Sequence, residues 1–492
     1  MSMFHRVGRL RSGLRTIAAT TQTRVETTST SPTSFTLAQP LQRQHQARKM
    51  STASNVQLSS ADATSLCYSV PEHITPASAQ RTSALLQQNH VDHDIFFNSS
   101  GFHNHIVHHL LTLYALGASP AQIQKQYAVN ESYQRPAGKA KEGVVHEMSD
   151  ASKFVGFLGK ARYYSDFLRY FQQEIETKGW ESVVDEVLFR RDQRAEAMLG
   201  RLFAGFLHPQ IHLGFGVEFN QPAIIAESLA QTAVHEGWMK DLLISAEDAA
   251  SSRSSEPSKS FVEIIDQIQA TISLRDAADV DGNRIRDGIM RTDSKTMIDM
   301  MSQYKISSAD ELEERTAEMI NTTAYFTAAA QNPPKLVKMD FFYMHSINAS
   351  IFFSAFLKQN WLSDENKIRL LEWKVRNDAA LYASRGCARL LLDEITDYKP
   401  KRPSGWAEII DRVTEHEDDG HACKLIRALA HGEQVCKPFE HNKDSFRIKG
   451  DMWLKLGHMA IDSVESPPPR WVRSCGYASA WTEVQDRPSA HL

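Results

Sequence analysis

Hydrophobic residues recur at the helical spacing along most of the chain from about residue 60 onward. Within residues 104–117, the apolar side chains from Val107 to Tyr114 fall on one stripe of a helix, and Gly117 follows as a stop signal. Alternating patterns that are typical of strands between tight turns are nearly absent. The pattern therefore predicts an all-α fold, with further helices over 162–171, 190–206, 222–244, 310–327, 340–359 and 364–395.

Charge divides the chain unevenly. The first fifty residues hold eight Arg or Lys and one acid, Glu26, whereas the remainder carries 47 basic and 58 acidic side chains. A start rich in Arg, Ser and Thr and nearly free of acids is typical of a mitochondrial transit peptide. A disordered tail, or an extension upstream of a start at Met50, is the alternative. We expect a cytoplasmic protein, with a mitochondrial location as the alternative that the basic leader suggests.

Several classes of protein are excluded by missing patterns. No apolar run reaches the roughly 20 residues that span a bilayer, so we expect no membrane span. The acidic body lacks a basic face for phosphates, so we expect no nucleic-acid partner. Five scattered cysteines without a C-x-x-C do not form a disulfide scaffold or a zinc knuckle. The glycine loops of flavin, nicotinamide and nucleotide sites are absent as well. Redox chemistry would then rely on a metal or on the substrate itself.

Two histidine pairs among the twenty histidines have metal-ligand spacing. His105 and His109 lie one turn apart, so they share a helix face on which two imidazoles can hold one ion. A pair that is solvated or packed is the alternative. His208 and His212 lie in apolar surroundings near a predicted core, although Pro209 weakens the argument from a shared helix face.

Two single histidines have polar or aromatic neighbours that suggest a role. His235 ends a polar stripe with Glu227 and Gln231. The stripe is a polar network within the site, a set of side chains that orient metal ligands, or the solvated face of the helix. His345 lies among phenylalanines, where a packed core histidine is the alternative to a ligand. The acidic segment 416–421, HEDDGH, is predicted to lie at the surface. Four further histidines have no matched partner nearby: His431, His441, His458 and His491.

Lys374 stands on an apolar stripe, because its helical neighbours at −4, −3 and +7 are leucines. Burial at such a position lowers the pKa of the amine, and a neutral amine can add carbon dioxide to form a carbamate ligand. The alternative is a lysine that reaches outward to water or pairs with Asp378 one turn on.

The chain resembles the questin oxidase family in several long runs. These include NHIVHHLLTLYALGAS, NESYQRP, RYYSDFLRYF, MLGRLFAGFLHPQIHLGFGVEFNQPAIIAESLAQTAVH, MHSINASIFF, LLEWKVRNDAALYASRG and WVRSCGYASAW. The similarity covers about residues 65–482 and leaves residues 1–60 outside. It implies one large helical catalytic domain over 61–482, preceded by a disordered basic leader over 1–60.

The resemblance also implies an activity, namely the oxidative ring opening of an anthraquinone or xanthone-type polyketide by dioxygen. The outcome is of the Baeyer–Villiger type, in fungal secondary metabolism and mycotoxin biosynthesis. Members are described as NADPH-dependent, as cofactor-free, and as non-haem iron dioxygenases. In the iron type, four histidines and a carbamylated lysine hold Fe(II). His105, His109 and His345 match ligand histidines, and Lys374 matches the lysine.

For the fourth ligand we favour His212 over His208, with His235 as a further candidate. A metal-free or NADPH-dependent oxidase of the same substrates is an alternative. An electron-rich phenolate can reduce dioxygen itself, and His208, His235 and Lys374 would then act as bases. A non-catalytic helical scaffold is a third hypothesis. Four aromatic residues near the predicted site are candidates to sandwich a planar substrate, or to form plain core: Phe206, Phe215, Tyr343 and Trp373.

Overall fold

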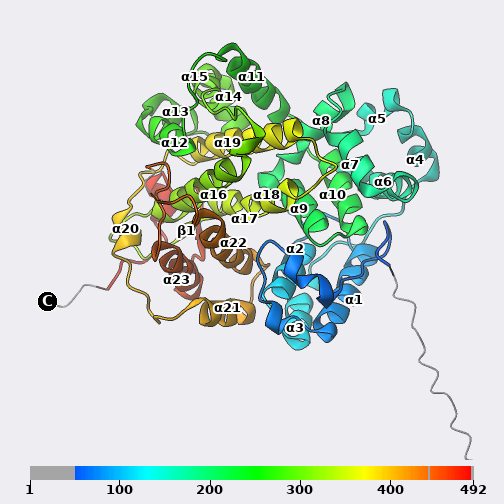
Figure 1. Cartoon of the computed structure of the whole chain (residues 1–492), viewed down its shortest axis with the longest axis horizontal. Coiled ribbons are helices and arrows are strands. Elements are labelled where there is room, and N and C mark those ends of the chain that lie inside the picture. Colours follow the sequence, from blue (N-terminus) through cyan, green and yellow to red (C-terminus); the bar gives the residue numbers. More distant parts are fainter. Residues whose placement is uncertain (1–49, 442–443, 489–492) are drawn as a thin grey trace, which may run out of the picture. The chain divides into compact units, whose positions relative to one another are not determined.

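Helices account for nearly all regular structure in the computed structural model, which describes residues 50–441 and 444–488 (Figure 1). Two short strands, β1 (Met339–Asp340) and β2 (Trp471–Val472), pair in parallel, with Met339 opposite Trp471. The all-α prediction is confirmed. None of the helices in the described ranges is long and apolar enough to cross a membrane.

The helices follow one another with short connections. The first ten are α1 (Pro76–Asp92), α2 (Ile106–Ala115), α3 (Pro120–Glu131), α4 (Glu142–Met148), α5 (Ala151–Phe157), α6 (Tyr164–Lys178), α7 (Trp180–Leu188), α8 (Gln193–Leu202), α9 (His208–Glu218) and α10 (Pro222–Val234). The next six are α11 (Met239–Ser252), α12 (Phe261–Ala270), α13 (Ile272–Ala277), α14 (Met290–Thr292), α15 (Ser294–Met301) and α16 (Leu312–Ala329). The last seven are α17 (Tyr343–Ser350), α18 (Phe353–Leu357), α19 (Asp364–Ser384), α20 (Asp393–Thr396), α21 (Trp406–Glu415), α22 (His421–Cys436) and α23 (Met452–Glu465).

Side-chain caps define several helix starts. Ser363 precedes α19, and its side chain accepts a hydrogen bond from the amide of Asn366. Thr75 and Ser119 precede α1 and α3, where each forms a reciprocal capping box with the third helical residue. These polar caps satisfy amides that lack a partner within the helix, so they fix where each helix begins.

Four long predicted helices are interrupted. The segment 364–395 is helical only to Ser384, where α19 ends, and resumes at Asp393 in α20. The segment 222–244 stops after Val234, where the Nε atom of Arg201 donates to the carbonyl of His235 at 3.0 Å. The segment 340–359 divides into α17 and α18, and 190–206 ends at Leu202. Conversely, α11 extends into the predicted polar loop 245–260, of which only residues after 252 are loop. Apolar periodicity cannot register such breaks, because the carbonyls freed at them are satisfied by side chains distant in sequence.

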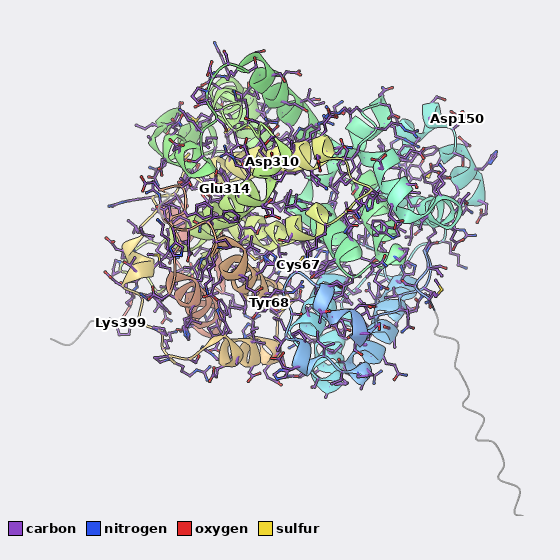
Figure 2. All side chains as sticks on the ribbon, in the orientation of Figure 1. Cys67, Tyr68, Asp150, Asp310, Glu314 and Lys399 are labelled. Atoms are coloured by element: carbon purple, nitrogen blue, oxygen red, sulfur yellow. The ribbon has the colours of Figure 1, made fainter. Side chains whose placement is uncertain are left out.

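The chain before α1 packs onto the helical body from residue 53 onward. Ala53, Val56 and Leu58, which fall within the predicted leader, lie in the hydrophobic core. Residues 1–49 of the predicted leader, which covers 1–60, lie outside the described residues. Further on, the amide of Cys67 donates to Glu218 on α9 at 2.9 Å, and Arg427 on α22 donates to the carbonyl of Tyr68 (Figure 2). These bonds tie this segment to two helices that carry the site described below.

Four helices from distant parts of the sequence meet in the interior. Helix α2 packs on both α9 and α22, and α17 packs on the same two helices. The start of α9 follows a backbone turn in which Phe206 and Leu207 have positive φ angles of 54° and 68°. This unusual conformation for large side chains directs the first residue of α9 toward the other three helices.

Candidate metal centre

Each of these four helices contributes one buried histidine at or near its N-terminal end. His105 caps α2, His208 opens α9, His345 lies in the first turn of α17, and His421 opens α22. The Nε2 atoms of His105 and His208 are 2.8 Å apart, and those of His345 and His421 are 3.3 Å apart. Ring nitrogens of His105, His208 and His421 all lie within 4.8 Å of one another.

The other nitrogen of each ring faces an acceptor. The Nδ1 atom of His208 is 2.6 Å from the carbonyl oxygen of Gly205, and that of His345 is 2.6 Å from the carbonyl oxygen of residue 341. The carboxylate of Asp419 lies 3.1 Å from Nδ1 of His105 and 2.5 Å from Nδ1 of His421. In the neutral rings of His208, His345 and His421 the proton must then sit on Nδ1, which leaves a lone pair on Nε2. The Nδ1 atom of His105 lies at ion-pair distance from Asp419, and the same tautomer is the one that this carboxylate favours.

Four imidazoles that direct Nε2 toward one another form a donor set that can hold a metal cation. Two unprotonated nitrogens 2.8 Å apart repel each other, and no hydrogen bond joins them unless one ring is charged. Burial opposes that charge and lowers the pKa of His105 to about 4, with the charge of Lys424 acting in the same direction. Neutral imidazoles that are oriented through Nδ1 are the form in which histidine binds transition metals.

Lys424 is the basic group of this centre. It lies three residues after His421 on α22, is only 4% exposed, and its Nζ has no hydrogen-bond partner among the described residues. Burial lowers the pKa of its amine. Burial also lowers the pKa of His208, His345 and His421, and the charge of Lys424 acts in the same direction. A buried amine without a hydrogen-bond partner is costly, which makes Lys424 a candidate for modification or for contact with an added ligand.

Lys374 lies in a different polar group. Its Nζ pairs with Asp378 one turn on and donates to the carbonyl of Ser346 at 3.1 Å. Both partners of the ion pair are fully buried. This is the ion-pair alternative from the sequence analysis. In this arrangement the amine donates to Asp378 and to the carbonyl of Ser346, and none of the four imidazoles is among its hydrogen-bond partners in the described residues.

The remaining predicted histidines surround the centre. His109 lies against Asn130, with a nitrogen-to-nitrogen distance of 3.4 Å, and its Nε2 has no partner in the described ranges. His212 is bonded on both sides, to Glu227 at 2.8 Å and to His108 at 3.2 Å. The structure therefore groups His105, His208 and His345 of the predicted set, while His109 and His212 lie beside that group.

A cavity of about 910 Å³ opens onto the centre. His105 and His208 line it, as do His103 and His235, whose Nε2 atoms are 2.9 Å apart. His103 also stacks on His208, with ring centroids 3.9 Å apart. The lining also includes a set of phenylalanine and tryptophan side chains: Phe96, Phe102, Phe203, Phe206, Trp238, Phe341 and Phe342.

Of the four aromatic residues singled out from the sequence, only Phe206 lines this cavity. The others are core residues: Phe215, Tyr343 and Trp373.

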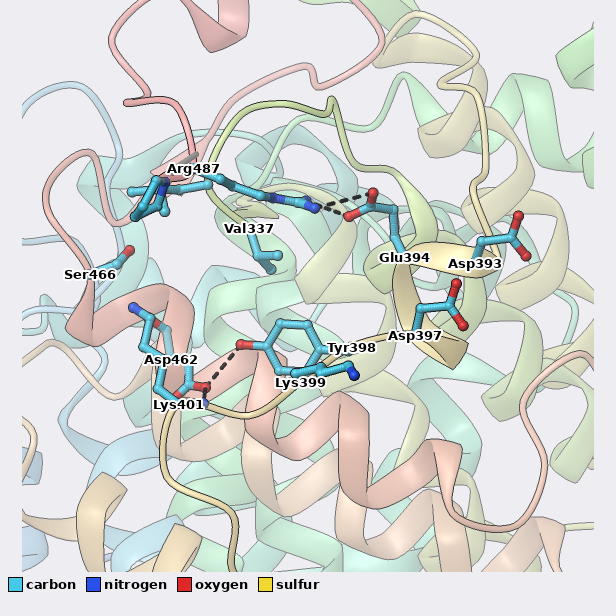
Figure 3. Close-up of a pocket in the computed structure, with 12 residues that line it drawn as sticks. Val337, Asp393, Glu394, Asp397, Tyr398, Lys399, Lys401, Asp462, Ser466 and Arg487 are labelled. Carbon is cyan, nitrogen blue, oxygen red and sulfur yellow. Dashed lines mark hydrogen bonds and ion pairs between the residues drawn. The ribbon is translucent and has the colours of Figure 1, made fainter. Parts of the chain in front are cut away.

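A second pocket, of about 380 Å³, has another character (Figure 3). Arg487 pairs with Glu394 across it, and the hydroxyl of Tyr398 donates to Asp462 at 2.9 Å. No histidine lines it. Glu394 and Asp462 are therefore already paired within the protein, and this pocket is separate from the histidine centre.

Comparison with known proteins decides the family. A family model described as questin oxidase-like matches residues 102–429, a range that holds all four histidines and Lys424. The chain belongs to the questin oxidase-like family.

Relatives of this questin oxidase-like protein have names that agree with the assignment. A Baeyer–Villiger oxidase of Pestalotiopsis fici is 38% identical over 83% of this chain and 93% of its own length. A questin oxidase of Aspergillus terreus is 38% identical over 81% of this chain and 91% of its own length. The oxidoreductase AflY of Aspergillus parasiticus is 38% identical over 85% of both chains. The protein is therefore an oxidoreductase, as predicted.

Sequence reasoning missed His421, Asp419 and Lys424. The prediction that segment 416–421 lies at the surface is wrong for His421, which is 1% exposed. A signal was present in the apolar run that follows, ACKLIRALA, which places His421 and Lys424 at the start of a buried helix. Gly420 at φ +89° is a second signal, since a Cβ there would lie 2.7 Å from the Cβ of His109.

Proposed function

We propose that this questin oxidase-like protein opens a ring of a planar aromatic polyketide, of the anthraquinone or xanthone type, with dioxygen. The names of its relatives support an oxidation of the Baeyer–Villiger type. The observation that carries the proposal is the set of four buried imidazoles whose Nε2 atoms face one another beside a cavity with aromatic lining.

The metal that we propose for this set is Fe(II). Imidazole ligands suit iron, and a single carboxylate that orients two of the rings is the kind of support that ligand histidines receive. His105, His208, His345 and His421 would hold it. When bound, iron supplies the electron transfer that lets dioxygen react with a singlet organic molecule.

For the carbamylated lysine we propose Lys424 in place of Lys374. The amine of Lys424 is buried, lacks a partner in the described ranges and shares the first turn of α22 with His421. The amine of Lys374 is already engaged by Asp378 and the carbonyl of Ser346. A carbamate on Lys424 would add an oxygen ligand and remove a buried positive charge from among the imidazoles.

The cavity supports roles for residues that do not hold the metal. Its aromatic walls fit a flat ring system and exclude water from the reacting face. His103 and His235 face each other across 2.9 Å, so one proton can be shared between their Nε2 atoms. Burial lowers the pKa of His235 to about 4, so its ring is neutral and can accept a hydrogen bond from a phenol hydroxyl of the substrate.

The same pair favours the metal-free alternative. If a substrate phenolate reduced dioxygen directly, His103 and His235 would be sufficient as bases, and iron would be dispensable. Dependence on NADPH stays a prediction.

Turnover of anthraquinone substrates under ¹⁸O₂ separates these routes. We expect ring-opened product with incorporated ¹⁸O from iron-loaded protein, and loss of activity after chelation that Fe(II) restores. His421→Ala is expected to abolish both iron retention and turnover. His431→Ala, which alters an equally buried histidine on the same helix, is the matched control and should retain both. Full activity of the chelated protein would contradict the iron route, and dependence on NADPH alone would favour a reductive one.

A further inference from the structure

The cavity contains a buried guanidinium that the histidine chemistry does not use. Arg385 lines the same cavity as His105 and His208, yet it is only 6% exposed. Its Cζ atom lies 4.1 Å from the ring centroid of Phe342 and 5.9 Å from that of Phe206. Arg385 therefore sits against the aromatic wall on which a planar ligand would stack.

Arg385 has no carboxylate partner within 4.0 Å among the described residues. It donates only to two hydroxyls, those of Ser384 at 3.0 Å and Ser474 at 3.4 Å. The acid whose charge it feels most is Asp340, and both carboxylate oxygens of Asp340 accept backbone amides instead. A buried guanidinium normally has an ionic partner, because desolvation of an unpaired charge is expensive.

The rest of the cavity lining is also short of negative charge. Arg473 stands on the same lining, with its Cζ 4.7 Å from the ring centroid of Phe341. The one acid among the lining residues, Glu236, already pairs with Arg286 at 2.9 Å. An uncharged aromatic ligand would leave the Arg385 charge unmatched, whereas an anionic one would complete it.

We propose that Arg385 binds an anionic oxygen substituent, a carboxylate or an ionised phenol, on the planar aromatic ligand of this cavity. By holding the acidic edge of the ligand, the guanidinium would fix how the ring system is oriented in the cavity. It would thereby determine which ring of the ligand faces the histidine centre. This inference rests on the proposed function, since it assumes that the cavity takes an aromatic polyketide. It narrows the substrates to those that carry an acidic group at one edge.

Binding measurements without turnover test this inference. Calorimetric titration of the anaerobic full-length protein would compare anthraquinone-2-carboxylate, 2-hydroxyanthraquinone above the pKa of its phenol, and the uncharged anthraquinone-2-carboxamide. We expect one or both anions to bind wild type at least tenfold more tightly than the carboxamide, and the preferred anion identifies the group recognised. Arg385→Met should reduce that preference by roughly 10- to 150-fold, which is the range of a charged hydrogen bond. Arg389→Met, an exposed arginine outside the cavity lining, should leave it unchanged.

The outcomes that contradict the inference are distinct from those that contradict the proposed function. Equal affinity of wild type for all three probes overturns the role of Arg385 and leaves the aromatic cavity intact. Equal weakening of every probe by Arg385→Met does the same, because it shows a loss of packing only. If no probe binds wild type, the proposed function itself fails. Because Arg473 lines the same cavity, the preference of wild type alone does not identify Arg385. Arg385→Lys is the second variant if Arg385→Met does not fold, and an anion preference that is unchanged in a folded Arg385 variant also overturns the inference.

Discussion

The substitution Asp419→Asn changes the orientation of two proposed metal ligands without changing the number of ligands. One carboxylate faces Nδ1 of both His105 and His421, at 3.1 and 2.5 Å. An asparagine has a single acceptor oxygen, so its NH₂ group must face one of the two rings. That ring then moves its proton to Nε2 or turns away, and in either case a lone pair leaves the metal centre.

The magnitude follows from one charged hydrogen bond. Such a bond contributes about 1.5–3 kcal/mol, which corresponds to a roughly 10- to 150-fold loss of iron affinity. Competition with a chelator of known affinity, followed by iron analysis of the desalted protein, measures it. Asp418→Asn is the matched control, because Asp418 accepts from the amides of Gly420 and Ala422 at 2.7 and 2.9 Å and contacts no ligand ring. Iron affinity of Asp419→Asn within twofold of wild type, or an equal loss in both variants, would refute the reasoning.

Three further predictions concern stability. Gly420→Ala should lower the free energy of unfolding by at least about 1 kcal/mol in urea, since φ is +89° and the new Cβ meets a histidine of α2. Gly143→Ala, where a Cβ meets nothing within 4 Å, should not destabilise the protein. Lys374→Met should cost about 3–5 kcal/mol by leaving Asp378 buried and unpaired, whereas the scaffold hypothesis expects no loss. Lys374→Met combined with Asp378→Leu should recover most of this cost, and an additive loss would contradict the pairing. Metal-free protein should lose stability as the pH falls from about 6.5 to 4. The folded pKa of His105 is about 4, so the unfolded chain binds more protons in that window, and a flat urea midpoint there would contradict the buried neutral histidines.

Much of the helical framework can be predicted from apolar periodicity. The helix that ends near Ala115 and the cap at Ser363 are where the pattern places them. The helix breaks after Val234 and Leu202 cannot be predicted from this pattern. They depend on tertiary partners such as Arg201 and on a strained turn before α9. Local patterns report which face of a segment is apolar, but they do not report where a distant side chain can satisfy a freed carbonyl.

The site is predictable only in part, for a related reason. His105 is a candidate from its spacing with His109, and His208 and His345 from their apolar or aromatic neighbours. His421 follows an acidic turn that is typical of a surface. The meeting of α2 with α22 turns that surface pattern into a buried one, with Asp419 facing inward to two imidazoles. Burial alone also could not choose between Lys374 and Lys424. The choice depends on which amine lacks a partner, and only the packed structure shows this.

Anomalous X-ray diffraction at the iron edge, from crystals of the iron-loaded protein, tests the central claim most directly. The account predicts one strong peak bounded by the Nε2 atoms of His105, His208, His345 and His421, with the side chain of Lys424 directed toward it. A peak at another group of residues, or no peak in crystals of protein that turns over substrate, would contradict the claim that these four imidazoles form the metal centre.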